Sequence, residues 1–384
     1  MTTPIKVLSV IGTRPEAIKM APVLLRMQSE PSRFNSIVCA TGQHYRMFDQ
    51  GLGAFPVEVH YNLKLMSANQ KLDELTARAI TGIGSVVDEV RPDIVFVHGD
   101  TTTTLAGALS AYYQGVPVAH IEAGLRTGDL RSPFPEEANR ALTDRLSAYC
   151  FAPTERNRAA LLREGVPAGR IFVTGNTAID ALFMVRDNIA VLNPNNWSSQ
   201  FGKAFETIVE SDGPIILLTA HRRENFGDGL RSIYGAIKEL SLAYPEWSFV
   251  YPVHLNPNVQ EPAREILDGL RNVYLIEPLD YEPFVFLMNR SHLILTDSGG
   301  IQEEAPSLGK PVVVLREKTE RQEAVEAGTV LLVGTDKEKI KETVHSLISD
   351  SALYTEMSRR MNPYGDGQAT ERILLSLEDE WAKR

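Results

Sequence analysis

The stretch IKVLSVIGTRPEAIKM, residues 5–20, decides the fold. Its first part, residues 5–11, is a short β-branched apolar run of the kind that forms a strand buried on both faces of a sheet. A helix is predicted from Pro15, because proline suits the first helical turn and Ile18 and Val23 recur on one side. A buried strand followed by a helix is the repeating unit of a parallel α/β fold.

The same alternation runs along the rest of the chain, with helical patterns between most of the strands. In the first half we predict further strands at residues 35–41, 93–99, 117–123, 148–153 and 170–175. In the second half we predict strands at residues 214–220, 248–254, 272–278, 292–298, 311–316 and 328–334. The pattern therefore predicts an α/β protein with two Rossmann-like, doubly wound sheets.

The break in the pattern after Gly175 gives the expected domain organisation. We expect one Rossmann-like domain in residues 1–175, a connecting helix and linker in 176–212, and a second such domain in 213–365. The amphipathic helix in 366–384 is expected to pack back on the first domain. Two sheets joined in this way are predicted to face a cleft that binds the ligand at the strand ends.

Composition limits the classes of function. The chain has 384 residues and a net charge of -10, with no basic run, which argues against nucleic acid and an anionic membrane surface as partners. The N-terminus enters a strand almost at once and no apolar run spans a bilayer, so we expect a cytoplasmic protein. Cys39 and Cys150 form no metal or redox spacing and are expected to be reduced core thiols.

Acidic residues follow two predicted strands in HGDTTTT (98–104) and HIEAGLRTGDLRSPFPEEANR (120–140). Asp100, Glu122 and Glu136 are expected to lie in one crevice and to provide acid/base catalysis. Two alternatives remain open, because Asp100 could cap the next helix and Glu136 could form a salt bridge with Arg140. We also count Arg140 among the candidate substrate-binding residues.

DSGGIQEEAPSLGKP (297–311) follows a predicted strand and opens a helix, which favours a bound diphosphate. Its candidate residues are Ser298, Gly299, Gly300 and, for ribose hydroxyls, Glu304. The alternative is a plain strand-to-helix turn capped by serine, with the glutamate as a solvated helix acid.

Cations and histidines near other strand ends complete the candidate set. Arg14, Lys19 and Arg321 could bind phosphates, although each alone could be an ordinary surface cation. His221 in TAHRREN (219–225) could bind a phosphate or act as an acid on the leaving group, or it could be a packing histidine. The sequence lacks a dinucleotide-binding glycine motif, a phosphate-loop lysine motif, a serine nucleophile elbow and zinc spacing, so no cofactor and no metal is expected.

Taken in order, these motifs resemble the non-hydrolysing UDP-N-acetylglucosamine 2-epimerases. The segments that carry the resemblance are GTRPEAIKM, TGQH, HGDTTTT, EAGLRTGDLRSPFPEEANR, TAHRREN, YPVHLNP, DSGGIQEEAPSLGKP and TER, from residue 12 to residue 321. The resemblance implies a fold like that of the GT-B glycosyltransferases, usually as a homodimer. It also implies a UDP-sugar as substrate and the interconversion of UDP-N-acetylglucosamine (UDP-GlcNAc) and UDP-N-acetylmannosamine (UDP-ManNAc).

The resemblance also implies residue roles. Asp100, Glu122, Glu136 and His221 match the catalytic positions, and Phe284 matches the position beside the uracil. The UDP-binding positions are matched by Arg14, Lys19, Ser298, Gly299, Gly300, Glu304 and Arg321. Gln43, His44 and His254 match a regulatory UDP-GlcNAc site of some members, but Arg46, Asn69 and Gln322 differ from the residues expected in regulated members.

Other functions remain open from the sequence. A GT-B glycosyltransferase would share the fold and the nucleotide site, but the acid cluster argues against it. The chain could also be a hydrolysing epimerase, a nucleotide-sugar sensor or an epimerase of a modified UDP-GlcNAc. Precursors of cell-surface polysaccharides are typical products of the resembling family.

Overall fold

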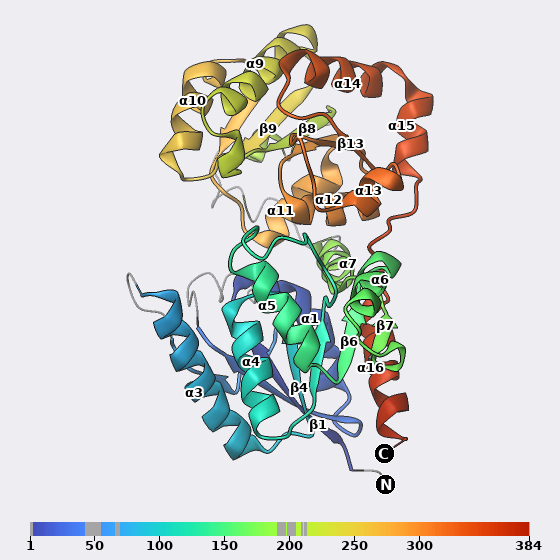
Figure 1. The fold of residues 1–384 in the computed structure, drawn as a ribbon. Helices are drawn as coiled ribbons and strands as arrows, with labels where there is room; N and C mark the ends of the chain where they lie inside the picture. Colours follow the sequence, from blue (N-terminus) through green and yellow to red (C-terminus); the bar gives the residue numbers. More distant parts are fainter. Residues whose placement is uncertain are drawn as a thin grey trace. The chain divides into compact units, whose positions relative to one another are not determined.

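The computed structural model describes residues 3–42, 55–65, 70–189, 197, 205–208, 210 and 213–383. It divides into two compact units, Met1–Met184 with Tyr364–Arg384, and Val185–Pro363. Each unit is a parallel sheet flanked by helices, which confirms the predicted fold class of two Rossmann-like doubly wound domains (Figure 1). None of the helices in the described ranges combines the length and the apolar composition needed to cross a membrane.

The first unit is built on a parallel sheet with the order β3-β2-β1-β4-β5-β6-β7. Its strands are β1 Ile5–Ile11, β2 Phe34–Ala40, β3 Tyr61–Asn62, β4 Ile94–His98, β5 Val118–Ile121, β6 Tyr149–Ala152 and β7 Ile171–Val173. Its helices are α1 Arg14–Ser29, α3 Leu72–Val90, α4 Thr102–Tyr113, α5 Glu136–Leu146, α6 Glu155–Arg163, η1 Ala168–Arg170 and α16 Ala369–Trp381. Helix α7, Thr177–Ile189, begins in this unit and ends in the second.

Alternation of side chains along β1 explains the two hydrophobic layers of this unit. Val7 and Ile11 pack with α1 and α16 on one face of the sheet. Leu8 and Val10 pack with α3 and α4 on the other face (Figure 1). Because both faces are covered, the strand is apolar throughout, as the sequence predicts.

The second unit repeats the same winding, with the strand order β10-β9-β8-β11-β12-β13. Its strands are β8 Ile215–Thr219, β9 Ser248–Pro252, β10 Val273–Ile276, β11 Leu293–Thr296, β12 Val312–Val314 and β13 Val330–Leu332. Its helices are η3 Arg223–Asn225, α9 Asp228–Ala243, α10 Pro257–Leu267, α11 Tyr281–Arg290, α12 Gly299–Glu304, η4 Ala305–Leu308, α13 Gln322–Glu326, α14 Lys337–Ser349 and α15 Ser351–Ser358.

Every strand predicted from the sequence is confirmed, with ends that differ by only a few residues from the predicted ones. The short β3, which is not predicted, pairs with β2 at Tyr61 and Asn62. A two-residue strand has too few side chains to produce a period of two, so its pairing comes from the backbone of β2.

The C-terminal helix α16 belongs to the first compact unit. Ile373, Leu374 and Leu377 are buried in the same cluster as α1. The carboxylate of Asp180, on α7, accepts hydrogen bonds from the backbone nitrogens of Ala369 at 3.2 Å and Thr370 at 2.8 Å. A buried carboxylate on one helix therefore caps the start of another that is distant in sequence.

We predict that Asp180→Ala lowers the free energy of unfolding by about 2 kcal/mol, because two amide groups at the start of α16 lose a charged acceptor. Urea denaturation followed by circular dichroism measures this change. Asp366→Ala, which removes an exposed partner of Arg372, is the control and should cost less than about 1 kcal/mol. Equal losses in the two variants would contradict the capping role.

Candidate active site

The first site is at the carboxyl edge of the first sheet, where the chain winds in opposite directions from β1 and β4. Glu16 joins the loops that follow these two strands. Its Oε2 accepts hydrogen bonds from the backbone of Gly12 at 3.0 Å and Thr13 at 2.6 Å. Its Oε1 accepts hydrogen bonds from the hydroxyls of Thr101 at 2.6 Å and Thr104 at 3.0 Å.

Glu16 was not among the candidate residues, yet it organises the loop that carries Arg14. It forms a capping box with Thr13 at the start of α1, and burial raises the pKa of its carboxyl group. The Thr-x-x-Glu spacing in the sequence is the signal that could have revealed this role. The two loops are so close that a Cβ at Gly12 would lie 2.2 Å from the hydroxyl of Thr103.

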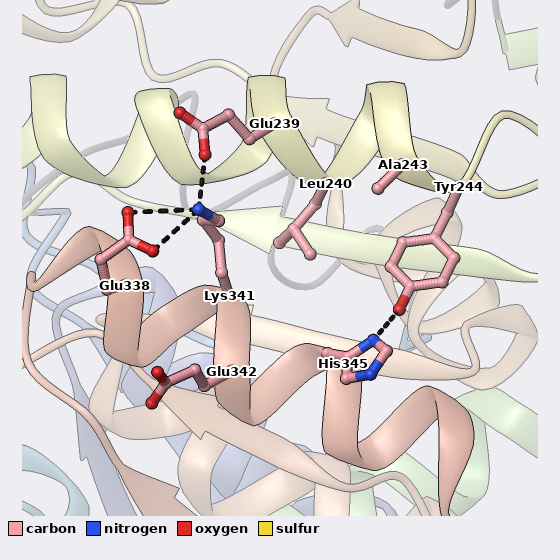
Figure 2. A pocket seen from close by; sticks show the side chains of 8 residues that line it. All are labelled: Glu239, Leu240, Ala243, Tyr244, Glu338, Lys341, Glu342 and His345. Carbon is pink, nitrogen blue, oxygen red and sulfur yellow. Dashed lines mark hydrogen bonds and ion pairs between the residues drawn. The ribbon is translucent and has the colours of Figure 1, made fainter.

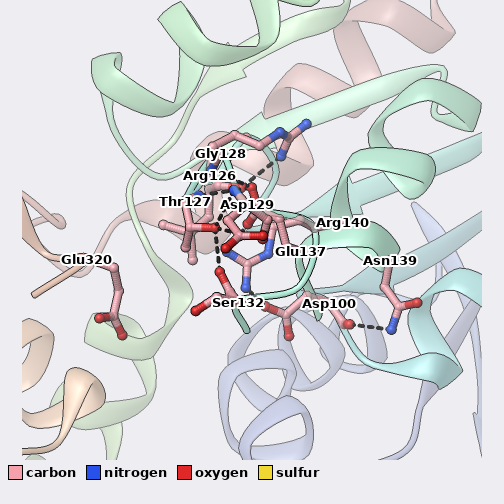
Figure 3. Close-up of polar contacts among 12 residues, drawn as sticks. Asp100, Arg126, Thr127, Gly128, Asp129, Ser132, Glu137, Asn139, Arg140 and Glu320 are labelled. Carbon is pink, nitrogen blue, oxygen red and sulfur yellow. Dashed lines mark hydrogen bonds and ion pairs between the residues drawn. The ribbon is translucent and has the colours of Figure 1, made fainter. Parts of the chain in front are cut away.

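Asp100 follows β4 and is held by two residues of α5. Its carboxylate is 2.5 Å from a guanidinium nitrogen of Arg140, and its backbone oxygen accepts a hydrogen bond from Asn139 at 2.9 Å (Figure 3). Burial raises the pKa of Asp100 despite the opposing charge of Arg140, and nearby Glu122 and Glu136 add to the rise. A carboxyl group with a raised pKa can exchange protons with a substrate near neutral pH.

Arg140 is itself almost fully buried and also lies 3.3 Å from Glu137. Glu137 in turn accepts hydrogen bonds from the backbone nitrogens of Thr127 and Gly128, both at 2.9 Å (Figure 3). The guanidinium is thus fixed by two carboxylates of its own unit. The sequence predicts that Arg140 binds substrate. In the structure its guanidinium pairs with Asp100, the acid that precedes α4.

Glu122 follows β5 directly and has a left-handed backbone, with φ of 68°. Its carboxylate is 2.5 Å from the amino group of Lys19 and 3.7 Å from Nε2 of His98. A left-handed conformation is uncommon for a residue with a side chain and often marks a functional position. Lys19, expected from the sequence to bind phosphate, therefore also pairs with a candidate catalytic acid.

Glu136 is the first residue of α5 and is half-buried. The ion pairs that Arg140 makes within the described ranges go to Asp100 and Glu137, so the alternative salt bridge from Glu136 to Arg140 is not formed. Glu136 is close enough to Asp100 to contribute to the rise of its pKa. The three acids predicted from the sequence are therefore grouped within one unit.

In the second unit, His221 follows β8, at the point where the winding reverses between β8 and β11. The buried carboxylate of Asp297 accepts hydrogen bonds from the backbone of His221 and Arg222, both at 2.8 Å, and from Asn225 at 3.0 Å. Asp297 thereby fixes the turn that carries the histidine. Asp297 lies in DSGG, and no local pattern around it indicates that it would hold a different loop.

The His221 ring stacks on the ring of His254, with centroids 5.5 Å apart and planes 13° apart. Burial lowers the pKa of His221, and the neighbouring His254 and Arg222 lower it further, while Asp297 opposes these effects. Of the three residues expected at a regulatory site, His254 is described here. Gln43 and His44 lie outside the described residues.

The glycine turn lies at the start of α12, after β11. A Cβ at Gly299 would lie 3.2 Å from the guanidinium carbon of Arg321, whereas a Cβ at Gly300 would meet nothing within 4 Å. Arg321 is held by Glu303 at 2.8 Å and by Glu320 at 2.9 Å. The structure therefore brings together the turn and the cation that the sequence analysis proposed separately.

Glu304 and Phe284 also lie in the second unit. The hydroxyl of Tyr281 donates a hydrogen bond to Glu304 at 3.4 Å, and Phe284 is one turn further along α11 and half-buried. Among the described residues there is no group of three or more His, Cys, Asp or Glu side chains arranged to hold a metal ion.

A separate hollow of about 260 Å³ lies between α9 and α14, as Figure 2 shows. Leu240 and Ala243 line it together with charged and aromatic side chains, and Lys341 contacts Glu239 at 2.5 Å. The hollow is at the C-terminal half of α9, which returns toward the amino ends of the strands. It is therefore distinct from the edge that carries His221 and the glycine turn.

Comparison with known proteins identifies the family. A family model described as UDP-N-acetylglucosamine 2-epimerase matches residues 26–378. This chain belongs to the UDP-N-acetylglucosamine 2-epimerase family. UDP-N-acetylglucosamine 2-epimerases of Yersinia pestis and of Escherichia coli strain K12 are each 54% identical to it over 374 residues, which cover 97% of this chain and 98% of each relative.

A solved structure of the family is also similar. The crystal structure of UDP-GlcNAc 2-epimerase from Neisseria meningitidis bound to UDP-GlcNAc is 51% identical and superimposes with a TM-score of 0.88. The match covers 98% of this chain and 100% of that one. The likeness therefore extends over both units, and it favours an epimerase over a glycosyltransferase.

One prediction for this epimerase concerns the pH dependence of its stability. Burial lowers the pKa of His98 from 6.5 to about 4, although Glu122 opposes the change. Between pH 6.5 and 4 the unfolded chain then binds more protons at His98 than the folded chain, so this residue destabilises the fold as the pH falls. Its unfavourable effect is absent above pH 6.5.

We predict that the native chain loses about 2 kcal/mol more unfolding free energy between pH 7 and pH 5 than His98→Asn does. Urea denaturation at both pH values measures the difference, and other titrating groups cancel between the two proteins. His60→Asn, which changes a histidine elsewhere in the same unit, is the control. An identical pH dependence in native protein and His98→Asn would contradict a neutral buried histidine.

Proposed function

We propose that this chain is a non-hydrolysing epimerase that interconverts UDP-GlcNAc and UDP-ManNAc. The observation that carries the proposal is the grouping of Asp100, Glu122 and Glu136 at one edge of the first sheet, with Lys19 and Arg140 beside them. Support comes from the similar Neisseria meningitidis enzyme, whose crystal structure holds UDP-GlcNAc.

The chemistry explains why several acids are needed. The C2 hydrogen of the sugar is not adjacent to a carbonyl group, so direct removal of the proton is very slow. In the proposed reaction the C1–O bond breaks, its electron pair leaves with UDP, and a base takes the C2 proton. This leaves a 2-acetamidoglucal with a C1–C2 double bond. UDP then adds back to C1 while an acid delivers a proton to the opposite face of C2.

In this scheme residues of the first unit transfer the C2 proton. One of the three carboxylates, Asp100, Glu122 or Glu136, acts as the base that takes the C2 proton. A second one, once protonated, delivers a proton to the other face. The raised pKa of Asp100 suits a group that alternates between these states. Lys19 and Arg140 limit the repulsion among the carboxylates and keep them in place.

The second unit, in the same scheme, binds UDP and assists its departure. The diphosphate is assigned to Ser298, Gly299, Gly300 and Arg321, the ribose to Glu304 and the uracil to Phe284. For Arg14 and Lys19 the family resemblance also supports phosphate binding. His221 donates a hydrogen bond to the leaving oxygen. The requirement to retain UDP follows from the chemistry, because an intermediate that loses UDP cannot return to either sugar.

Further elements of the proposal concern regulation and context. A regulatory role of Gln43, His44 and His254 stays a prediction from the family resemblance, and the departures at Arg46, Asn69 and Gln322 argue against it. We also propose that the reaction takes place in the cytoplasm and supplies precursors of cell-surface polysaccharides. The family resemblance supports both statements.

The decisive experiment is proton NMR of UDP-GlcNAc incubated with pure protein in D2O without added cofactor. We expect UDP-ManNAc to accumulate with deuterium at C2, because the proton removed exchanges with solvent before return. Free N-acetylmannosamine would indicate a hydrolysing enzyme instead. An unchanged spectrum would contradict the proposed substrate.

In the same assay, Asp100→Asn, Glu122→Gln and Glu136→Gln are each expected to lower turnover by about 100-fold or more, because an amide cannot transfer the proton. Asp93→Asn is the matched control, since Asp93 lies beside the amino end of the same strand that Asp100 follows. Near-native turnover in all three variants would show that these acids do not perform the chemistry.

We also propose that the chain is a homodimer. Tyr113, near the end of α4, is 70% exposed, and Leu142 on the adjacent α5 is 54% exposed, so these packed helices present an apolar surface. Light scattering is expected to give twice the chain mass of 42.6 kDa. Tyr113→Ser combined with Leu142→Ser should shift the mass toward that of one chain. A monomer mass for the unaltered protein at micromolar concentration would contradict the dimer.

A further inference from the structure

His120 and Asp144 form a fully buried pair in the first unit, and the proposed reaction gives neither residue a role. His120 is on β5, where side-chain alternation directs it away from Ala119 and Ile121. Asp144 is near the end of α5. Nδ1 of His120 lies 2.6 Å from the Asp144 carboxylate.

The surroundings of the ring define its protonation state. Nε2 of His120 lies 2.7 Å from the backbone oxygen of Gly99, which can only accept a hydrogen bond. Nδ1 faces a carboxylate, which in its ionised form also accepts only. A neutral ring would direct an unshared electron pair at one of these oxygens. The two acceptors that face the two ring nitrogens therefore favour a ring with hydrogen on both.

Its charge is balanced by neighbouring groups. Burial alone would raise the pKa of Asp144, but His120 and Arg126 outweigh this effect and lower it. Arg126 is 2.7 Å from Asp144 and also pairs with Glu164 at 2.7 Å. The four groups form a chain of two positive and two negative charges that starts at buried His120 and ends at exposed Glu164.

The pair contacts the loops that carry two of the proposed catalytic acids. Gly99, whose carbonyl accepts from His120, directly precedes Asp100. The second oxygen of Asp144 accepts a hydrogen bond at 3.2 Å from the backbone nitrogen of Gly124, two residues after Glu122. The two acids lie on different loops, and Glu122 has a left-handed backbone that its surroundings must maintain.

We propose that the His120 ring and the Asp144 carboxylate are positioning residues that set the separation of Asp100 and Glu122, and this inference rests on the proposed function. Neither residue contacts the sugar. They act through the Gly99 carbonyl on one loop and the Gly124 amide on the other. Proton removal on one face of C2 and return on the other needs the acids of this cluster at fixed places, so the His120–Asp144 pair governs turnover rather than substrate affinity.

Side chains from several strands and loops surround the His120–Asp144 pair. His98 ends β4, Arg126 is in the loop after β5, and Cys150 on β6 is opposite His120 in the sheet register. The charge of His120 contributes to the lowered pKa of His98, while burial contributes most. Burial raises the pKa of Cys150, so that side chain stays a neutral thiol. Asp144 and Gly99 are thus the acceptors that hold the ring.

The kinetic test uses Asp144→Asn and His120→Leu in the full-length protein. Each is expected to lower kcat for UDP-GlcNAc epimerisation by about 100-fold, because the acids move relative to each other. KM and the dissociation constant of UDP should stay within about threefold of the native values. Asp180→Asn, at another buried acid of the same unit, is the matched control and should lose stability but keep its kcat.

The second readout is nitrogen-15 NMR of protein labelled at histidine. We expect one histidine with both ring nitrogens protonated, and its signal should shift in Asp144→Asn. This measurement does not depend on catalytic activity, and it can be made on the native protein even if His120→Leu does not fold. It also separates the two proposals, since a native protein without epimerase activity would overturn the proposed function while the spectrum still reports the pair.

A His120 signal that shows one nitrogen without hydrogen would overturn the doubly protonated ring. Values of kcat within about fivefold of native in both variants would overturn the positioning role. A parallel loss of kcat in Asp180→Asn would do the same, because general destabilisation would then explain the effect. Loss of UDP affinity equal to the loss of kcat would also contradict a role confined to the acids.

Discussion

The first unit depends on the neutralisation of carboxylates buried at one edge of its sheet. An ionised acid removed from water is costly unless a cation or hydrogen-bond donors replace its hydration. Asp100 has Arg140, Glu122 has Lys19, and Asp144 has His120 and Arg126. The cation that offsets the cost of burying each carboxylate thus also fixes the position of that carboxylate.

Helix α5 supplies much of this arrangement from one side. Glu137, Arg140 and Asp144 recur at intervals of three and four residues, so they share its buried face. Glu137 orders the preceding loop, Arg140 holds Asp100, and Asp144 holds His120. A helix face that would carry apolar side chains in an ordinary core carries charges here.

The fold and the candidate acids could be predicted from the sequence because each depends on local pattern. Strands such as IKVLSVI are apolar throughout, and acids directly after strands fall at the ligand-binding edge of a parallel sheet. The ion-pair partner of each charged residue could not be predicted. Lys19 pairs with Glu122 across 103 residues, and Arg140 pairs with Asp100 rather than with Glu136, its helical neighbour. Such contacts depend on strand order, which a single sequence does not specify.

The two units use the same point of reversed winding in different ways. In the first unit, charged side chains occupy the loops after β1, β4 and β5, so the edge is suited to moving protons. In the second unit, the buried carboxylate of Asp297 accepts hydrogen bonds from backbone nitrogens of the His221 turn. The groups near the strand ends are then a histidine, two glycines and Arg321. An edge of that kind suits an anion rather than acid/base chemistry. The difference between the two similar sheets follows from which strand ends carry acids and which carry glycines.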